Sequence, residues 1–289
     1  MKAIFRKLGI ALGALVGLLL LAVLVLYLVG SSRVNRTYEV ATADLVIPAG
    51  PTAVERGAHL AEINGCTDCH GPNLEGKIMI DAPPFRVVPA NLTRGEGGVG
   101  DQYDARSFDA AIRHGIGSDG RALFIMPSAA FHQLSDDDAA ALIAYLQQVP
   151  PVDNVLPSTE FRPLGRLLAA IALDTDMEVN AEAARRDAPP PGATAEYGAY
   201  LASITCAYCH GGPRLGGAQP PMPGSPPAPA LGAAGRWSPD EFEVALRTGM
   251  TPDGRRLDPE FMPWTFTANM SDDEIQALHA YLATLSPDA

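Results

Sequence analysis

The chain of 289 residues contains one sequence unit twice, and this duplication restricts its fold more than any other feature. The motif Cys-x-x-Cys-His-Gly occurs at 66–71 and again at 206–211, each time shortly after a Gly-Ala-x-Leu-Ala segment. Each copy then continues with Phe-x-x-Ala-x-Arg-x-Gly, Asp-Gly-Arg, Met-Pro and a final segment that begins Ser-Asp-Asp. An internal repeat of this kind indicates two similar structural units whose functional residues correspond in pairs.

Both copies have the sequence pattern of short helices joined by loops rich in glycine and proline, and neither contains an alternating apolar pattern of strand length. The last helix of each copy has a start signal, a serine cap followed three positions later by an acidic residue. These pairs are Ser135 with Asp138 and Ser271 with Glu274. We therefore predict an all-α fold.

The first thirty residues differ in kind from the rest of the chain. Lys2, Arg6 and Lys7 precede an uncharged apolar stretch from Leu8 to Gly30. This length suits a membrane-spanning helix, which needs about 20 apolar residues, better than the apolar part of a cleaved signal peptide, which has about 7 to 15. We expect a retained anchor with a cytoplasmic N-terminus and the remainder of the chain on the outer, periplasmic side. A signal peptide cut near Gly30 is the alternative.

The repeat and the composition divide the chain into four parts. We predict a cytoplasmic N-terminus and transmembrane anchor at 1–36, a first domain at 37–151, a linker at 152–190 and a second domain at 191–289. The linker contains one short apolar run, Leu164 to Leu173, which could form a helix lying over a domain. The net charge of −12 argues against binding to nucleic acid, because phosphate groups select basic surfaces.

Four cysteines in an exported chain could form disulfides, bind zinc, act as redox thiols or attach haem. The histidine after each cysteine pair favours haem, because two thioether bonds and an axial nitrogen can then reach one porphyrin. A zinc ribbon usually has its cysteine pairs about 15 to 20 residues apart. A disulfide within Cys-x-x-Cys closes a very small loop, stabilises little and leaves the histidine unexplained. We therefore expect two covalently bound haem c groups.

A methionine thioether is the expected second axial ligand of each iron. Met126 and Met262 each precede a proline at corresponding positions of the repeat. His114 and His132 are rivals for the first haem, although neither has a histidine partner in the second copy. The predicted cofactor-binding residues are Cys66, Cys69, His70, Met126, Cys206, Cys209, His210 and Met262, of which His70, Met126, His210 and Met262 bind the metal. Arg113 and Arg247 could bind haem propionates or could serve packing.

On these motifs, both halves resemble class I c-type cytochrome domains. The whole chain resembles membrane-anchored dihaem cytochromes related to cytochrome c subunits of periplasmic dehydrogenases. The resemblance implies two tandem domains in which the first and last helices cross beside the haem, with Gly57 or Gly198 allowing the close approach. It also implies haem attachment outside the cytoplasm.

One-electron transfer is the function that this resemblance predicts, in a subunit of a larger membrane complex rather than in an enzyme. The expected partners are a dehydrogenase or quinol-oxidising complex as donor, and an oxidase, reductase or photosynthetic centre as acceptor. The alternative is a haem enzyme, a dihaem peroxidase or a thiosulfate-oxidising cytochrome, with one open or unusual haem site. No pair of carboxylates or activated nucleophile suggests other catalysis.

Overall fold

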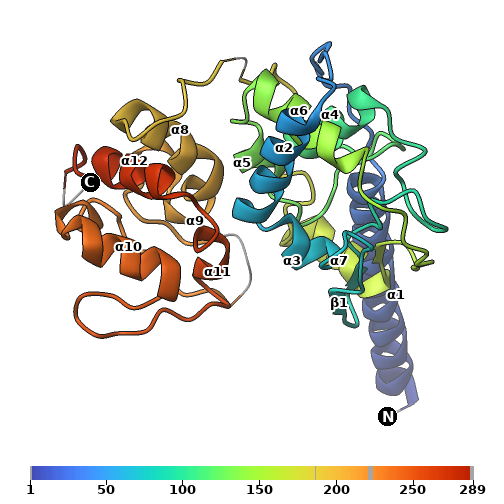
Figure 1. Cartoon of the computed structure of the whole chain (residues 1–289). Helices are drawn as coiled ribbons and strands as arrows, with labels where there is room; N and C mark the ends of the chain where they lie inside the picture. The colour runs from blue at the N-terminus through green and yellow to red at the C-terminus, as the bar shows by residue number, and fades with distance from the viewer. Residues whose placement is uncertain (1, 186, 221–223, 287–289) are drawn as a thin grey trace.

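The protein consists of a long N-terminal helix and two helical domains that lie side by side (Figure 1). The computed structural model describes residues 2–185, 187–220 and 224–286. The long helix, α1 (Lys2–Val34), projects away from the domains and exposes its apolar side chains along most of its length. Among the described residues it is the one helix long and apolar enough to cross a membrane.

The two domains repeat the same order of short helices. The first contains α2 (Pro51–Ile63), α3 (Cys66–His70), α4 (Ala105–His114), α5 (Ser128–Phe131) and α6 (Asp136–Leu146). The second contains α8 (Ala195–Thr205), α9 (Ala207–His210), α10 (Pro239–Thr248), α11 (Trp264–Thr267) and α12 (Asp272–Leu282), with 3₁₀ turns at Gly212–Arg214 and Ala234–Arg236.

A small antiparallel sheet accompanies the first domain and was not predicted. Its strands are β1 (Ile80–Asp81), β2 (Phe85–Val87) and β3 (Glu160–Phe161), in the order β1-β2-β3. Strands of two or three residues are too short to show an alternating pattern in the sequence. The chain is otherwise helical, as expected.

The core of each domain is the crossing of its first and last helices. A Cβ atom added at Gly57 of α2 would lie 2.1 Å from the carbonyl oxygen of Ala141 in α6. At Gly198 of α8 it would lie 1.9 Å from the carbonyl oxygen of Ala277 in α12. The two backbones therefore touch, which brings the apolar faces of each helix pair into a continuous core. That core includes Leu60, Ile63, Leu142 and Ile143 in the first domain and Leu201, Ile204, Leu278 and Leu282 in the second.

The predicted helix starts are confirmed. The Ser135 hydroxyl accepts a hydrogen bond from the Asp138 backbone N–H at 3.2 Å. At α12 the Glu274 carboxylate also reaches back to the Ser271 backbone N–H, which completes a capping box. Both final helices thus begin where the sequence pattern places them.

The segment that follows the first domain is held against that domain. The Val152 carbonyl accepts a hydrogen bond from the Asn91 side chain at 2.8 Å, and β3 pairs with β2. The apolar run forms α7 (Pro163–Ile171), which packs against α1. Farther on, the Asn180 carbonyl accepts a hydrogen bond from the His114 ring at 2.7 Å. We call residues 152–185 the strap.

A charged cluster joins the two domains. The Arg56 guanidinium of α2 bonds Asp138 of its own domain at 2.9 Å and lies 3.4 Å from Glu274 of the other. His59 bonds Glu274 at 2.7 Å, and the Tyr200 hydroxyl of the second domain donates to Asp138 at 2.6 Å. Burial alone would raise the pKa of Glu274, but the hydrogen bonds from His59 and Ser271 and the charge of Arg56 hold it below its usual value. Glu274 therefore stays ionised in the interface.

Gly57→Ala tests the helix crossing. Because the new methyl group would overlap backbone atoms that cannot rotate away, we expect the first domain to lose about 3 kcal/mol of stability, the upper part of the range for overpacking. Urea unfolding measures the loss. Gly117→Ala is the matched control, since a Cβ there meets nothing closer than 3.4 Å. Equal stability of the two variants would contradict the close crossing.

Candidate cofactor-attachment sites

Each Cys-x-x-Cys-His motif lies on a short helix directly after the first helix of its domain, α3 after α2 and α9 after α8. All four cysteines are free thiols, so no disulfide forms among the described residues. Burial raises the pKa of the Cys66 thiol to about 12 and also raises the pKa of Cys69, Cys206 and Cys209. The free thiols are therefore protonated at neutral pH, unlike the low-pKa cysteines of redox enzymes.

The two motif histidines are oriented identically by backbone carbonyls. His70 Nδ1 lies 2.8 Å from the Ala90 carbonyl oxygen, and His210 Nδ1 lies 2.8 Å from that of Pro229. Since a carbonyl only accepts, Nδ1 carries the proton and Nε2 keeps its lone pair. Burial lowers the pKa of both rings, which keeps them neutral. Both are thus prepared as nitrogen ligands through Nε2.

The loops after the histidines also share one geometry. Leu74 and Leu215 are buried and both have positive φ, 60° and 50°. Their carbonyls accept hydrogen bonds from the backbone N–H groups of Leu92 and Leu231 at 2.8 and 2.9 Å. A positive φ is costly for leucine, so its occurrence at both corresponding sites indicates a common constraint in the fold.

The two Met-Pro pairs form the same turn. The Met126 carbonyl accepts a hydrogen bond from the Ser128 N–H at 2.7 Å, and the Met262 carbonyl accepts one from the Trp264 N–H at 2.7 Å. The intervening prolines have φ and ψ of −78° and 54° and of −77° and 63°, which are inverse γ-turn values. The paired placement of the methionines in the sequence is therefore matched by their backbone geometry. Their role as ligands remains a prediction.

These residues fit haem c better than a bare metal ion. Each site offers two thiols for thioether bonds and a neutral imidazole whose Nε2 makes no hydrogen bond in the described part of the chain. In that same part, no group of three or more His, Cys, Asp and Glu side chains is arranged to hold a metal ion.

The rival histidines make the same kind of contact as the motif histidines, because His114 Nδ1 bonds the Asn180 carbonyl and its buried Nε2 makes no hydrogen bond among the described residues, so their rivalry for the first haem stays open. His114 is fully buried, and His132 Nδ1 bonds the Arg113 carbonyl at 2.9 Å. Arg113 also serves the fold, because its guanidinium bonds the carboxylates of Asp109 at 2.5 Å and Asp136 at 2.8 Å. In the second domain, the Arg247 guanidinium donates a hydrogen bond to the Met270 carbonyl. These contacts fit the packing interpretation, but Nη2 of Arg113 is buried without a partner among the described residues, and propionate binding by either arginine stays a prediction.

Sequence reasoning missed a buried carboxyl group that joins the two sites. Glu178 in the strap is 1% exposed, and its carboxylate accepts hydrogen bonds from the Ala129 N–H at 3.0 Å and from the Tyr208 hydroxyl. Ala129 lies just after the Met126-Pro turn, while Tyr208 lies inside the second cysteine motif. Burial raises the pKa of this carboxyl. No sequence pattern distinguishes Glu178 from the other charged residues of the strap.

A second contact joins the first attachment motif to the second domain. A Cβ at Gly65, just before Cys66, would lie 2.3 Å from the Phe266 ring of α11. Phe266 lies in the short helix after the Met262-Pro turn, and Ala129 lies in the short helix after the Met126-Pro turn. Each methionine turn is therefore followed by a short helix that packs toward the other domain's attachment motif, as the contacts of α5 with α9 and of α11 with α2 also indicate.

Comparison with known families identifies both domains. Residues 54–150 match the family model of cytochrome c, and residues 193–282 match that of cytochrome c oxidase, cbb3-type, subunit III. The predicted resemblance and the predicted helical fold with two such domains are confirmed.

Several characterised proteins resemble most of the chain. One subunit of the nicotinate dehydrogenase of Pseudomonas putida is 30% identical over 260 residues, which cover 80% of this chain and 21% of that protein. The cytochrome c subunit of a quinone-dependent alcohol dehydrogenase from Gluconacetobacter polyoxogenes is 28% identical, covering 83% of this chain and 57% of the relative. The gluconate 2-dehydrogenase cytochrome c subunit of Pantoea cypripedii is 28% identical, with 82% and 60% covered. The chain thus spans less than two thirds of each relative.

Arg113→Ala and Arg247→Ala separate a buried ion pair from a partly exposed one. Removing Arg113 leaves the buried Asp109 carboxylate without its cation, so we expect a loss of about 3 to 5 kcal/mol. Arg247 pairs with Glu243 in a more exposed setting, and its loss should cost about 1 kcal/mol. Urea unfolding measures both. If the two variants lost equal stability, the packing role of Arg113 would be wrong.

Glu178→Ala tests the link between the domains. The change leaves the Ala129 N–H and the Tyr208 hydroxyl without their acceptor, and we expect a loss of about 2 kcal/mol from these partly buried groups. By calorimetry we expect one unfolding transition for the unaltered protein and two for the variant, since the domains lose a shared contact. Glu182→Ala, at an exposed position of the same strap, should leave the transition unchanged.

Proposed function

Because this chain belongs to the cytochrome c family and carries two cytochrome c domains, we propose that it relays single electrons between redox proteins. One haem c in each domain supplies an iron that takes up and releases one electron. Cys66 and Cys69 attach the first group and Cys206 and Cys209 the second. His70 and His210 provide the proximal nitrogen. This chain is a carrier subunit and turns over no substrate of its own.

Met126 and Met262 are the proposed second axial ligands. The observation that carries the proposal is the match between the domains, in which corresponding histidines bond a carbonyl at the same distance and corresponding methionines open the same turn. Two ligands contributed by the protein close a site to added molecules, as suits electron transfer rather than peroxide or thiosulfate chemistry.

A dehydrogenase is the proposed electron donor. Two of the relatives above are named as cytochrome c subunits of alcohol and gluconate dehydrogenases, and they align with more than four fifths of this chain. We propose that the chain is the corresponding subunit of a membrane complex, with a membrane-bound or periplasmic oxidant as acceptor. Anchorage through α1 with the haem domains on the periplasmic side fits this role.

The packing of the domains supports a relay between the two sites. Glu178 links the first methionine turn to the second cysteine motif, and Phe266 packs beside the first motif. A rigid interface fixes the separation of two redox centres, which an extended linker would leave variable. Glu178 is therefore proposed as a positioning residue of the relay.

Met126→Ala and Met262→Ala test the ligand assignment in the holoprotein. Each variant should keep two covalent haems by pyridine haemochrome analysis but lose about half of the sulfur-to-iron charge-transfer band, because one thioether ligand is gone. Each should also gain one cyanide-binding site. Met177→Ala, an exposed methionine in the strap, is the control and should change neither property. Cyanide binding by the unaltered protein would instead favour the haem-enzyme alternative.

A further inference from the structure

The end of α1 and the helix α7 form one packed unit. A Cβ at Gly30 would lie 1.6 Å from the Arg166 carbonyl oxygen, so the two backbones touch. The Arg33 guanidinium donates a hydrogen bond to the Ala169 carbonyl at 3.1 Å. These contacts fix the position of α7 along the axis of α1. Figure 1 shows the two helices side by side.

If α1 spans a bilayer as proposed above, α7 lies at the level of the bilayer surface. A helix crosses the hydrocarbon core with about 20 residues at about 1.5 Å each. Counted from Leu8, the first residue after Lys7, the crossing ends near Tyr27. The contact at Gly30 then lies about one helical turn beyond the hydrocarbon, in the layer of lipid head groups.

Apolar side chains of α7 remain uncovered at this level. Gly165 and Ala169 are buried, whereas Leu164 is 48% exposed and Ile171 is 67% exposed. Ile78, just before the hairpin on which α7 packs, is 48% exposed as well. An apolar face beside a membrane span suits insertion between head groups and acyl chains.

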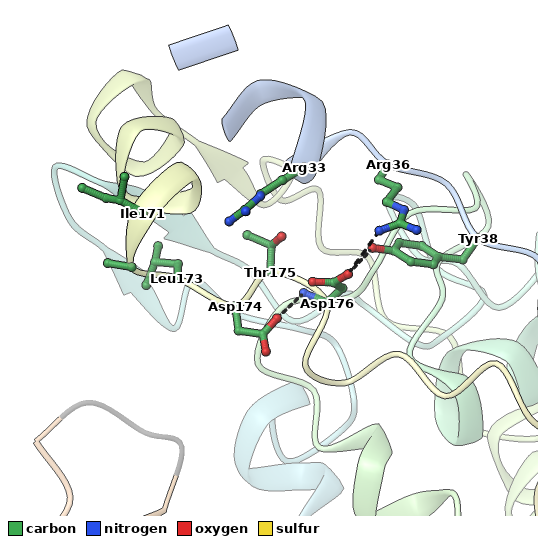
Figure 2. Close-up of a pocket in the computed structure, with 9 residues that line it drawn as sticks. Arg33, Arg36, Tyr38, Ile171, Leu173, Asp174, Thr175 and Asp176 are labelled. Carbon is green, nitrogen blue, oxygen red and sulfur yellow. Dashed lines mark hydrogen bonds and ion pairs between the residues drawn. The ribbon is translucent and has the colours of Figure 1, made fainter. Parts of the chain in front are cut away.

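A pocket of about 470 Å³ opens where α1 and α7 end (Figure 2). Arg33 and Arg36 lie on one side, Asp174 and Asp176 come from the segment after α7, and Ile171 lies at its edge. The Arg36 guanidinium is 3.8 Å from the Asp176 carboxylate, which also accepts a hydrogen bond from the Tyr38 hydroxyl at 2.6 Å. The pocket thus presents both cations and carboxylates at head-group height.

We infer that this unit is a phospholipid-binding surface. Leu164 and Ile171 face the acyl chains of the leaflet on the side of the haem domains, and the pocket holds a phosphoethanolamine head group. The arginines complement its phosphate. Asp174 complements its ammonium group, which donates hydrogen bonds as a choline group does not. The inference rests on the proposed membrane anchorage by α1.

Photolabelling tests the interfacial helix. The full-length holoprotein is placed in phosphatidylethanolamine-containing vesicles with a trace of lipid bearing an acyl-chain diazirine, and adducts are mapped by mass spectrometry. We expect adducts on α7 as well as on α1. Leu164→Gln with Ile171→Gln should abolish the α7 adducts and leave those on α1. Val244→Gln, on an exposed apolar position of α10 in the other domain, should change neither.

The outcomes separate this inference from the anchorage on which it rests. Adducts confined to α1 would overturn the interfacial helix and leave the anchor intact. Absence of adducts on both helices would overturn the anchorage itself. Cross-linking of α7 to another protein subunit in native membranes, with no lipid adduct, would show that a protein covers this face and would overturn the lipid assignment.

Native mass spectrometry tests the head group. The detergent-purified holoprotein is exchanged into equal amounts of phosphatidylethanolamine, phosphatidylcholine and phosphatidylglycerol. We expect preferential retention of phosphatidylethanolamine and its loss in Arg36→Gln. Arg94→Gln, an exposed arginine outside the pocket, is the control. Equal retention of the three lipids would overturn the phosphoethanolamine assignment.

Discussion

The contact between two helix backbones at a glycine is the constraint on which each domain depends. Gly57 against Ala141 and Gly198 against Ala277 bring the first and last helices together without an intervening side chain. Each cysteine motif begins directly beyond the first helix, so the crossing also sets where the thiols and the histidine lie relative to the core. The remaining short helices and loops of a domain, including the methionine turn, pack around this fixed pair.

Duplication supplied two such domains, and the interface between them uses positions that correspond in the repeat but carry different side chains. Arg56 and His59 on α2 correspond to Tyr197 and Tyr200 on α8. Arg56 and His59 on one side and the two phenols on the other meet Asp138 and Glu274 in the first turns of the last helices, so neither domain could make the same contacts with a copy of itself. The divergence of these positions therefore specifies the pairing of unlike domains.

The sequence was sufficient for the parts of the structure that local patterns encode. The caps at Ser135 and Ser271, the helical class and the family all follow from short motifs and their repetition. The strap could not be predicted in the same way, because its order comes from contacts with distant residues such as Asn91 and His114. Glu178 illustrates the limit, since only the fold reveals that this glutamate is buried between two sites.

The strap is one continuous segment that contacts the sheet, the helix α1 and the interface between the two domains. Its first part adds β3 to the sheet, its helix α7 lies on α1, and its last part carries Glu178 into the domain interface. A rigid connection of this kind limits how far either domain can tilt with respect to α1. If α1 lies in a membrane, the second attachment motif is then held at a defined height above it, although it is more than 170 residues from α1 in sequence. A partner docked on the same membrane would meet both sites in a constant orientation, which lowers the entropic cost of forming the complex.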